Sequence, residues 1–166
     1  MDNKQLKELE SRLWEAADQL RANSGISSHN YTAPVLGLIF LRFATLKYNQ
    51  YREAIEQAYL AGKGSRNERS KEEIAVEMCG FYLPDAANFD ALLSLPKDAD
   101  VILAIKKAMR AIEESRPELQ GCLPDAEYDN LKPTGDGNNN QDLAFDLLKI
   151  IDSIPKDITG DVFGKV

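Results

Sequence analysis

Residues 13–42 read LWEAADQLRANSGISSHNYTAPVLGLIFLR, and they join the end of an amphipathic helix to the start of an almost wholly apolar one. In the first helix, expected from about Asn3 to Arg21, apolar residues recur at spacings of three and four and therefore share one face. A polar turn around Gly25 is expected to end it. The stretch predicts a helical hairpin whose second arm is buried.

The second helix is expected to begin beside Pro34, because proline is tolerated in a first turn, and to end near Tyr59. The side-chain oxygens that could cap it belong to Ser27, Ser28, Asn30 and Thr32. Its first half is apolar on nearly all sides, which predicts that other helices surround it. A charge at Leu38 or Phe40 should then unfold the domain, because each buried side chain contributes ~1.5–3 kcal/mol. Gly37 is costly in a helix unless close packing needs the space.

The remaining chain shows helical periodicity or helix-boundary residues in four places. Helices are expected at about residues 71–80, 88–95, 100–114 and 140–153, with one more turn at 117–123. The first of these follows a capping box formed by Ser70 and Glu73. No segment alternates strictly between apolar and polar residues, so strands are not expected. The prediction is an all-α, irregular multi-helix bundle of about five to seven helices.

The length of 166 residues suits one domain with its own core. We expect a helical domain over residues 1–155 and a connector over 156–166. The longest apolar run, residues 33–41, is far shorter than the ~20 residues that cross a bilayer. The N-terminus lacks the continuous apolar stretch of a secretory signal, so the expected location is the cytoplasm.

The net charge of −7 argues against a protein that coats nucleic acid by charge alone. Residues 1–70 nevertheless carry 10 Lys/Arg against 8 Asp/Glu, whereas residues 71–166 carry 10 against 19, so a DNA-facing surface is expected in the first half. A flexible basic loop, AGKGSRNERSK at residues 61–71, lies there. Its candidate DNA-phosphate contacts are Lys63, Arg66, Arg69 and Lys71. The alternative is an ordinary solvated loop. Lys106, Lys107 and Arg110 form a second, weaker cluster that reads as helix surface.

Catalytic and metal-binding patterns are not found in the sequence. There is no nucleophile elbow, phosphate loop or dinucleotide-binding glycine motif. The single histidine, His29, lies in a Ser/Asn-rich turn and reads as a surface or capping residue. Residues 136–147 match a calcium loop at three positions but carry Gln141 where glycine is needed, so no metal is expected. Cys79 and Cys122 are expected to be reduced rather than paired.

Several segments in order resemble one family, the modification subunit of type I restriction-modification systems. The segments are LWEAADQLR at 13–21, YTAPVLGLIFLRF at 31–43, FYLP at 81–84, AMRAIEESRPELQG at 108–121 and GDVFGKV at 160–166. The resemblance covers essentially the whole chain. It implies a helical N-terminal domain that precedes a larger α/β domain with an S-adenosylmethionine site.

In that family the catalytic domain flips an adenine out of the duplex and methylates its N6, using an Asn-Pro-Pro-aromatic motif. This motif and the glycine-rich cofactor loop are not in the sequence, so the resemblance implies a fragment that is inactive alone, with no catalytic residue to assign. It implies as partners a specificity subunit, a second modification subunit and double-stranded DNA, in a bacterial or archaeal cytoplasm. S-adenosylmethionine is expected only for the full-length parent.

Three functional hypotheses remain open on the sequence. The first is an accessory domain that contributes to subunit assembly and DNA enclosure. The second is a protein-interaction adaptor bundle with no nucleic-acid role, which the acidic second half of the chain suits and which predicts an exposed apolar groove. The third, a free-standing enzyme, has little support, because it requires S-adenosylmethionine binding by a chain without the cofactor motif.

Overall fold

The computed structural model describes residues 28–131 and 140–153, together with eight separate positions between Lys4 and Ala22. All eight positions are helical, as the amphipathic pattern of the first helix predicts. The predicted turn at Gly25, the possible calcium loop before Asn140 and the connector over residues 156–166 lie outside the described residues.

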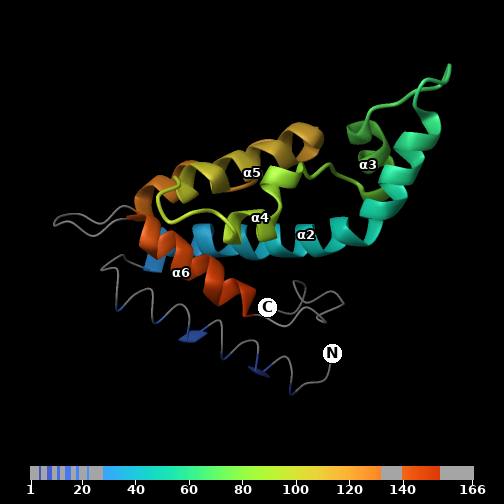
Figure 1. Cartoon of the computed structure of the whole chain (residues 1–166). Coiled ribbons are helices and arrows are strands. Elements are labelled where there is room, and N and C mark those ends of the chain that lie inside the picture. The colour runs from blue at the N-terminus through green and yellow to red at the C-terminus, as the bar shows by residue number, and fades with distance from the viewer. Residues whose placement is uncertain are drawn as a thin grey trace.

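The described chain consists of α-helices and short 3-10 helices, without a strand, which confirms the all-α prediction. The elements are α2 (Ser28–Gly62), α3 (Lys71–Cys79), η1 (Asp85–Ala87), α4 (Phe89–Leu93), α5 (Val101–Ser115), η2 (Pro117–Leu119), η3 (Ala126–Leu131) and α6 (Asn140–Asp152). Figure 1 shows α2 as the spine of the molecule, with α4 and α5 along its first half and α3 at its far end.

The core lies where the first half of α2 meets α4, α5 and α6. α5 supplies Ile105, Met109 and Ile112, and α6 supplies Leu148 and Ile151, all of which are at most 1% exposed. These residues recur at spacings of three and four, so each helix presents one apolar stripe to its neighbours. The periodicity that predicted these two helices therefore also identified their buried faces.

The start of α2 differs from the prediction. The helix begins at Ser28, so Asn30 and Thr32 lie inside it and do not cap it, and Pro34 lies beyond the first turn. A proline there leaves the carbonyl of Asn30 without its usual helical donor. Tertiary packing offsets this cost, because Pro34 is buried and its own carbonyl accepts a hydrogen bond of 2.9 Å from the Tyr128 hydroxyl.

At Gly37, α2 packs closely against Pro124, which precedes η3, and Tyr128, which lies within η3. A Cβ at this position would lie 2.4 Å from Cγ of Pro124 and 2.5 Å from the Tyr128 hydroxyl. The glycine is therefore required by close packing, as the sequence argument allowed. The prediction that helices surround this part of α2 on all sides is wrong, since Leu36 is 55% exposed and Phe40 is only half-buried.

Arg42 joins the middle of α2 to the end of α6. Its side chain is 3% exposed, and Nη1 donates a hydrogen bond of 2.7 Å to Oδ1 of Asp152. The guanidinium also lies over the ring of Phe89, 5.5 Å from the ring centroid. This buried cation fixes the position at which α6 ends.

The other helix boundaries follow their capping residues. Asn88 caps α4 by accepting hydrogen bonds from the backbone N–H groups of Asp90 and Ala91, and Asp100 caps α5 in the same way. The sequence did not predict η3, although Tyr128 and Leu131 within it are fully buried. A six-residue 3-10 helix is too short to show a helical period.

Candidate nucleic-acid interface

The candidate interface lies on a helical hairpin formed by the second half of α2, residues 63–70 and α3. Inside the hairpin Ile55 of α2 lies buried, as do Ile74 and Ala75 of α3. Figure 1 shows that this hairpin extends away from the part of the molecule that contains α5 and α6. The tip of the hairpin is therefore accessible to a large partner.

The capping box at the start of α3 is present, as predicted. The Ser70 hydroxyl accepts a hydrogen bond from the Glu73 N–H at 3.1 Å, and the Glu73 carboxylate accepts one from the Ser70 N–H at 3.0 Å. Gly80 ends the helix with φ of 98°, a left-handed conformation that glycine adopts readily. Both ends of α3 are thus set by local sequence.

The tip itself is an ordered turn. The Ser65 hydroxyl donates to the Gly62 carbonyl at 2.7 Å, and the Gly64 N–H donates to the Glu68 carboxylate at 3.1 Å. Gly64 has φ of 76° and no heavy atom near the position of a Cβ. The turn holds residues 63–69 at the surface, where every side chain is exposed.

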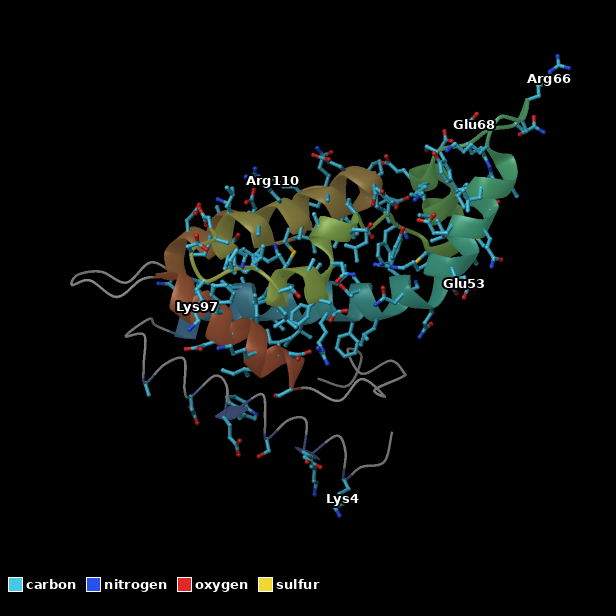
Figure 2. All side chains as sticks on the ribbon, in the orientation of Figure 1. Lys4, Glu53, Arg66, Glu68, Lys97 and Arg110 are labelled. Carbon is cyan, nitrogen blue, oxygen red and sulfur yellow. The ribbon has the colours of Figure 1, made fainter. Side chains whose placement is uncertain are left out.

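The four predicted phosphate contacts fall into two pairs. Lys63 and Arg66 are exposed and have no ion-pair partner among the residues that the structure describes. In Figure 2 the side chain of Arg66 points away from the rest of the molecule at the very end of the hairpin. These two cations are available to an external anion.

The second pair is engaged within the chain. Arg69 forms an ion pair with Glu77 of α3. Lys71 contacts Glu56 of α2 at 2.5 Å and lies over the ring of Tyr59 at 5.1 Å from its centroid. The hydrogen bond to Glu56 raises the pKa of the Lys71 ammonium above its usual value. Arg69 and Lys71 brace the hairpin, a role that the sequence argument did not assign to them.

The second basic cluster is neutralised by acidic residues, in agreement with its reading as helix surface. Lys106 on α5 contacts Asp129 at 2.7 Å, and this hydrogen bond raises the pKa of its ammonium. Arg110 contacts Asp125 at 2.8 Å. Lys107 is exposed and forms no ion pair with any residue that the structure describes, and a single exposed cation does not make a phosphate-binding surface.

An apolar groove lies beside Phe81, in the connector that leads from α3 to α5. Its volume is about 550 Å³. Its lining residues come from α2, the connector, α5 and η2, and they are Phe40, Phe43, Ala44, Lys47, Phe81, Ile112, Arg116, Glu118 and Leu119. Phe40 was predicted to be a core residue whose change to a charge would unfold the domain, and its half-exposed position in the groove wall contradicts that burial. An exposed apolar groove is the feature that the adaptor hypothesis predicted.

The described residues contain no group of three or more His, Cys, Asp or Glu side chains placed to hold a metal ion. His29 lies in the first turn of α2, next to neither basic cluster in the sequence. Cys79 and Cys122 are free thiols, the first buried and the second exposed. In the same part of the chain, no helix combines the length and apolar character needed to span a membrane.

Comparison with known proteins gives two findings. A family model described as the HsdM N-terminal domain matches residues 9–151. The chain is also 29% identical to the type I restriction enzyme MjaIX methylase subunit of Methanocaldococcus jannaschii, in an alignment that covers 70% of this chain and 22% of that protein. The matched region therefore spans about a fifth of the length of this curated relative.

Proposed function

Because this chain belongs to the family of HsdM N-terminal domains, we propose that it acts as the accessory helical domain of a type I restriction-modification DNA adenine-N6 methyltransferase subunit. In this proposal the domain contributes to subunit assembly and to the enclosure of double-stranded DNA. Its protein partners are a specificity subunit and a second modification subunit. Methyl transfer from S-adenosylmethionine belongs to the parent protein, and this chain supplies no catalytic residue to it.

The observation that carries the DNA part of the proposal is the position of Lys63 and Arg66. Two exposed cations stand at the end of a hairpin that extends from an otherwise acidic molecule. A protein with a net charge of −7 approaches DNA favourably only where cations project beyond its own negative field. The hairpin tip meets this condition, and contacts to phosphates there would position the domain without reading bases.

The ion pairs of Arg69 and Lys71 determine how many cations at the hairpin tip are available to DNA phosphates. Each of these side chains already has a carboxylate partner within the hairpin, so a phosphate would have to displace Glu77 or Glu56. The structure therefore supports two phosphate contacts where the sequence suggested four. Both residues support the interface indirectly, because Lys71 holds α3 against α2 and Arg69 holds the end of the turn against α3.

The test measures the salt dependence of DNA affinity in the complex of the methylase subunit with its specificity subunit. Each phosphate contact contributes about 0.9 to the slope of log affinity against log salt concentration. The double change of Lys63→Ala and Arg66→Ala should therefore flatten the slope by about 2. An unchanged slope would remove the hairpin tip from the DNA interface.

The matched control is the double change of Lys97→Ala and Lys107→Ala, which removes the same charge from exposed positions outside the hairpin. Lys97 lies at the opposite end of the molecule from Arg66 in Figure 2. The slope should stay unchanged in this control. Equal flattening in both variants would show that net charge, not the hairpin tip, determines the effect.

The apolar groove favours a second candidate function, protein docking without a nucleic-acid role. Half-buried rings such as Phe40 and Phe81 line it, and surfaces of this kind mark interaction sites. Under this candidate, deletion of the domain from the methylase subunit leaves DNA affinity unaltered. The salt-slope measurement separates the two functions, because only the first predicts a change on removal of Lys63 and Arg66.

A further inference from the structure

α2 does not run straight from the core into the hairpin. In Figure 1 the part of α2 beside α4 and the part beside α3 point in different directions. Abrupt changes of direction within a helix usually occur at proline, at glycine and serine, or at π-bulges. Residues 46–60 contain no proline, glycine or serine, and they are α-helical throughout. Contacts from outside the helix therefore hold the hairpin in its direction.

The end of α5 supplies two such contacts, both to the connector of residues 80–84 that follows α3. The Ser115 hydroxyl accepts a hydrogen bond of 3.0 Å from the Tyr82 N–H. The Arg116 guanidinium donates one of 2.9 Å, from Nη1, to the Gly80 carbonyl. The connector is thus tied to the end of α5 at two points.

The connector also packs against the middle of α2. The ring centroids of Phe81 and Tyr82 lie 6.0 Å and 6.3 Å from that of Tyr48. α3 itself packs mainly against α2, so the second arm of the hairpin reaches the core through this connector. The direction of the hairpin therefore depends on how the connector is held between α2 and the end of α5.

Both side chains at the end of α5 are fixed in place for these contacts. Ser115 is 8% exposed, and its hydroxyl donates to the Ile112 carbonyl at 2.8 Å, which leaves its oxygen to accept from the connector. The Arg116 guanidinium is held from the other side by Glu118, at 2.7 Å. α3 has no basic residue in its last turn, so Arg116 supplies the positive charge that stabilises the carboxyl end of a helix.

We propose that Ser115 and Arg116 form a latch that sets the direction of the hairpin and thereby positions its tip. At 1.5 Å per residue, α2 extends roughly 21 Å from Tyr48 to Gly62, so a rotation of ~10° displaces the tip by ~4 Å. Successive phosphates of one DNA strand are ~3.4 Å apart along the axis, so a loose hairpin would lose its register. The part that concerns DNA rests on the proposed function, whereas the latch itself does not.

The test measures the distance between the hairpin tip and α5 by double electron–electron resonance in the 166-residue chain. Spin labels are attached at Asn67→Cys and Lys107→Cys, two exposed positions, in a Cys122→Ser background that leaves only the buried Cys79. Arg116→Met removes the donors of the latch, and the fold should survive because this side chain is 44% exposed. The distance distribution should widen, or its centre should move, by ~4 Å.

Arg110→Met is the matched control for Arg116→Met. Arg110 lies on the same helix, is 52% exposed and pairs with Asp125, which lies outside the hairpin. Its loss should leave the distance distribution unchanged. Ser115→Ala removes the other half of the latch and should change the distribution in the same sense as Arg116→Met.

DNA affinity tests the positioning role of the latch. In the complex of the methylase subunit with its specificity subunit, Arg116→Met should lower DNA affinity about 3- to 10-fold relative to Arg110→Met, because a loosened hairpin must be ordered on binding. Both variants keep Lys63 and Arg66 and lose one positive charge. The slope of log affinity against log salt concentration should therefore be the same in the two.

Unchanged distances in both Arg116→Met and Ser115→Ala would overturn the latch, and so would an equal change in Arg110→Met. Equal DNA affinities of Arg116→Met and Arg110→Met would overturn its positioning role. Failure of the proposed function looks different. In that case the distances still respond to Arg116→Met, but the removal of Lys63 and Arg66 leaves the salt slope unchanged.

Discussion

The first half of α2 and the hairpin that begins with its second half are held in place by different interactions. In the first half Leu38 and Leu41 are fully buried, and contacts with α4, α5 and α6 hold the helix in place. In the hairpin few side chains are buried; the Lys71–Glu56 ion pair joins its two arms, and the Arg69 ion pair joins the turn to α3. The difference separates residues that specify the fold from residues that are free to contact a partner.

The comparison also explains why one helix can serve two purposes. The burial of apolar area against α4, α5 and α6 stabilises the first half of α2. The exposed ion pairs of the hairpin add little to the stability of the domain. The tip of the hairpin can therefore carry unpaired cations at almost no cost in folding free energy. Changes in the first half should affect stability, and changes at the tip should affect binding.

The largest effect is expected from a charge in the buried half. Leu38→Asp should lower the free energy of unfolding by more than ~4 kcal/mol, because it removes a fully buried side chain and leaves an unpaired carboxylate in its place. That loss approaches the whole stability of a domain at the lower end of the usual range, ~5 kcal/mol, so the variant should be largely unfolded before urea is added, as circular dichroism would show.

Leu36→Asp is the control for this variant, two residues away on the same helix. Leu36 is 55% exposed, so its charge stays hydrated and stability should change by no more than ~0.5 kcal/mol. Comparable losses in the two variants would show that the first half of α2 does not distinguish a buried face from an exposed one.

A smaller effect is expected at the glycine contact. Gly37→Ala should destabilise the domain by ~1–3 kcal/mol, because the added Cβ overlaps Pro124 and the Tyr128 hydroxyl. Gly62→Ala, at the end of the same helix, meets only one atom, at 3.9 Å, and should be neutral or slightly stabilising. Thermal unfolding of both variants checks the difference, and a neutral Gly37→Ala would refute the close packing.

The junction between the two regions should show a pH effect. Tyr48 is 5% exposed beside Phe81 and Tyr82, and burial, with the charge of Tyr82 as a second cause, raises its pKa to about 12. Above pH 10 the unfolded phenol loses its proton before the folded one does, so this residue's contribution to stability falls as pH rises.

The fall amounts to at most ~1.4 kcal/mol per pH unit between pH 10 and 12. Tyr48→Phe removes it, so the unfolding free energy of this variant should decline less steeply over the same range. Identical slopes for the two proteins would mean that the Tyr48 phenol titrates alike in the folded and unfolded chain.

The sequence predicted those parts of the fold that local patterns determine. The stripe of α5 and the capping box at Ser70 both depend on residues within one helical turn of each other, and both were found as expected. The start of α2 was missed because the cost of Pro34 inside a helix is offset by Tyr128, which lies 94 residues away. Long-range packing of this kind leaves no local pattern.

The same limit applies to the candidate interface. The basic loop was visible as a run of cations, but whether a cation is free depends on its neighbours in space. Lys71 meets Glu56 from fifteen residues earlier, and Arg69 meets Glu77 one helix turn beyond the hairpin's capping box. The sequence did not predict a role for Lys47, since only the fold places this residue at the apolar groove.

Photo-crosslinking from the hairpin tip to DNA tests the central claim most directly. A photoreactive side chain replaces Arg66 in the methylase subunit, and the assembled complex with the specificity subunit is irradiated on its DNA. The account predicts a covalent protein–DNA adduct from position 66 and none from the same side chain at position 97. Adducts of equal yield from both positions, or from neither, would contradict a DNA contact made by the tip of the hairpin.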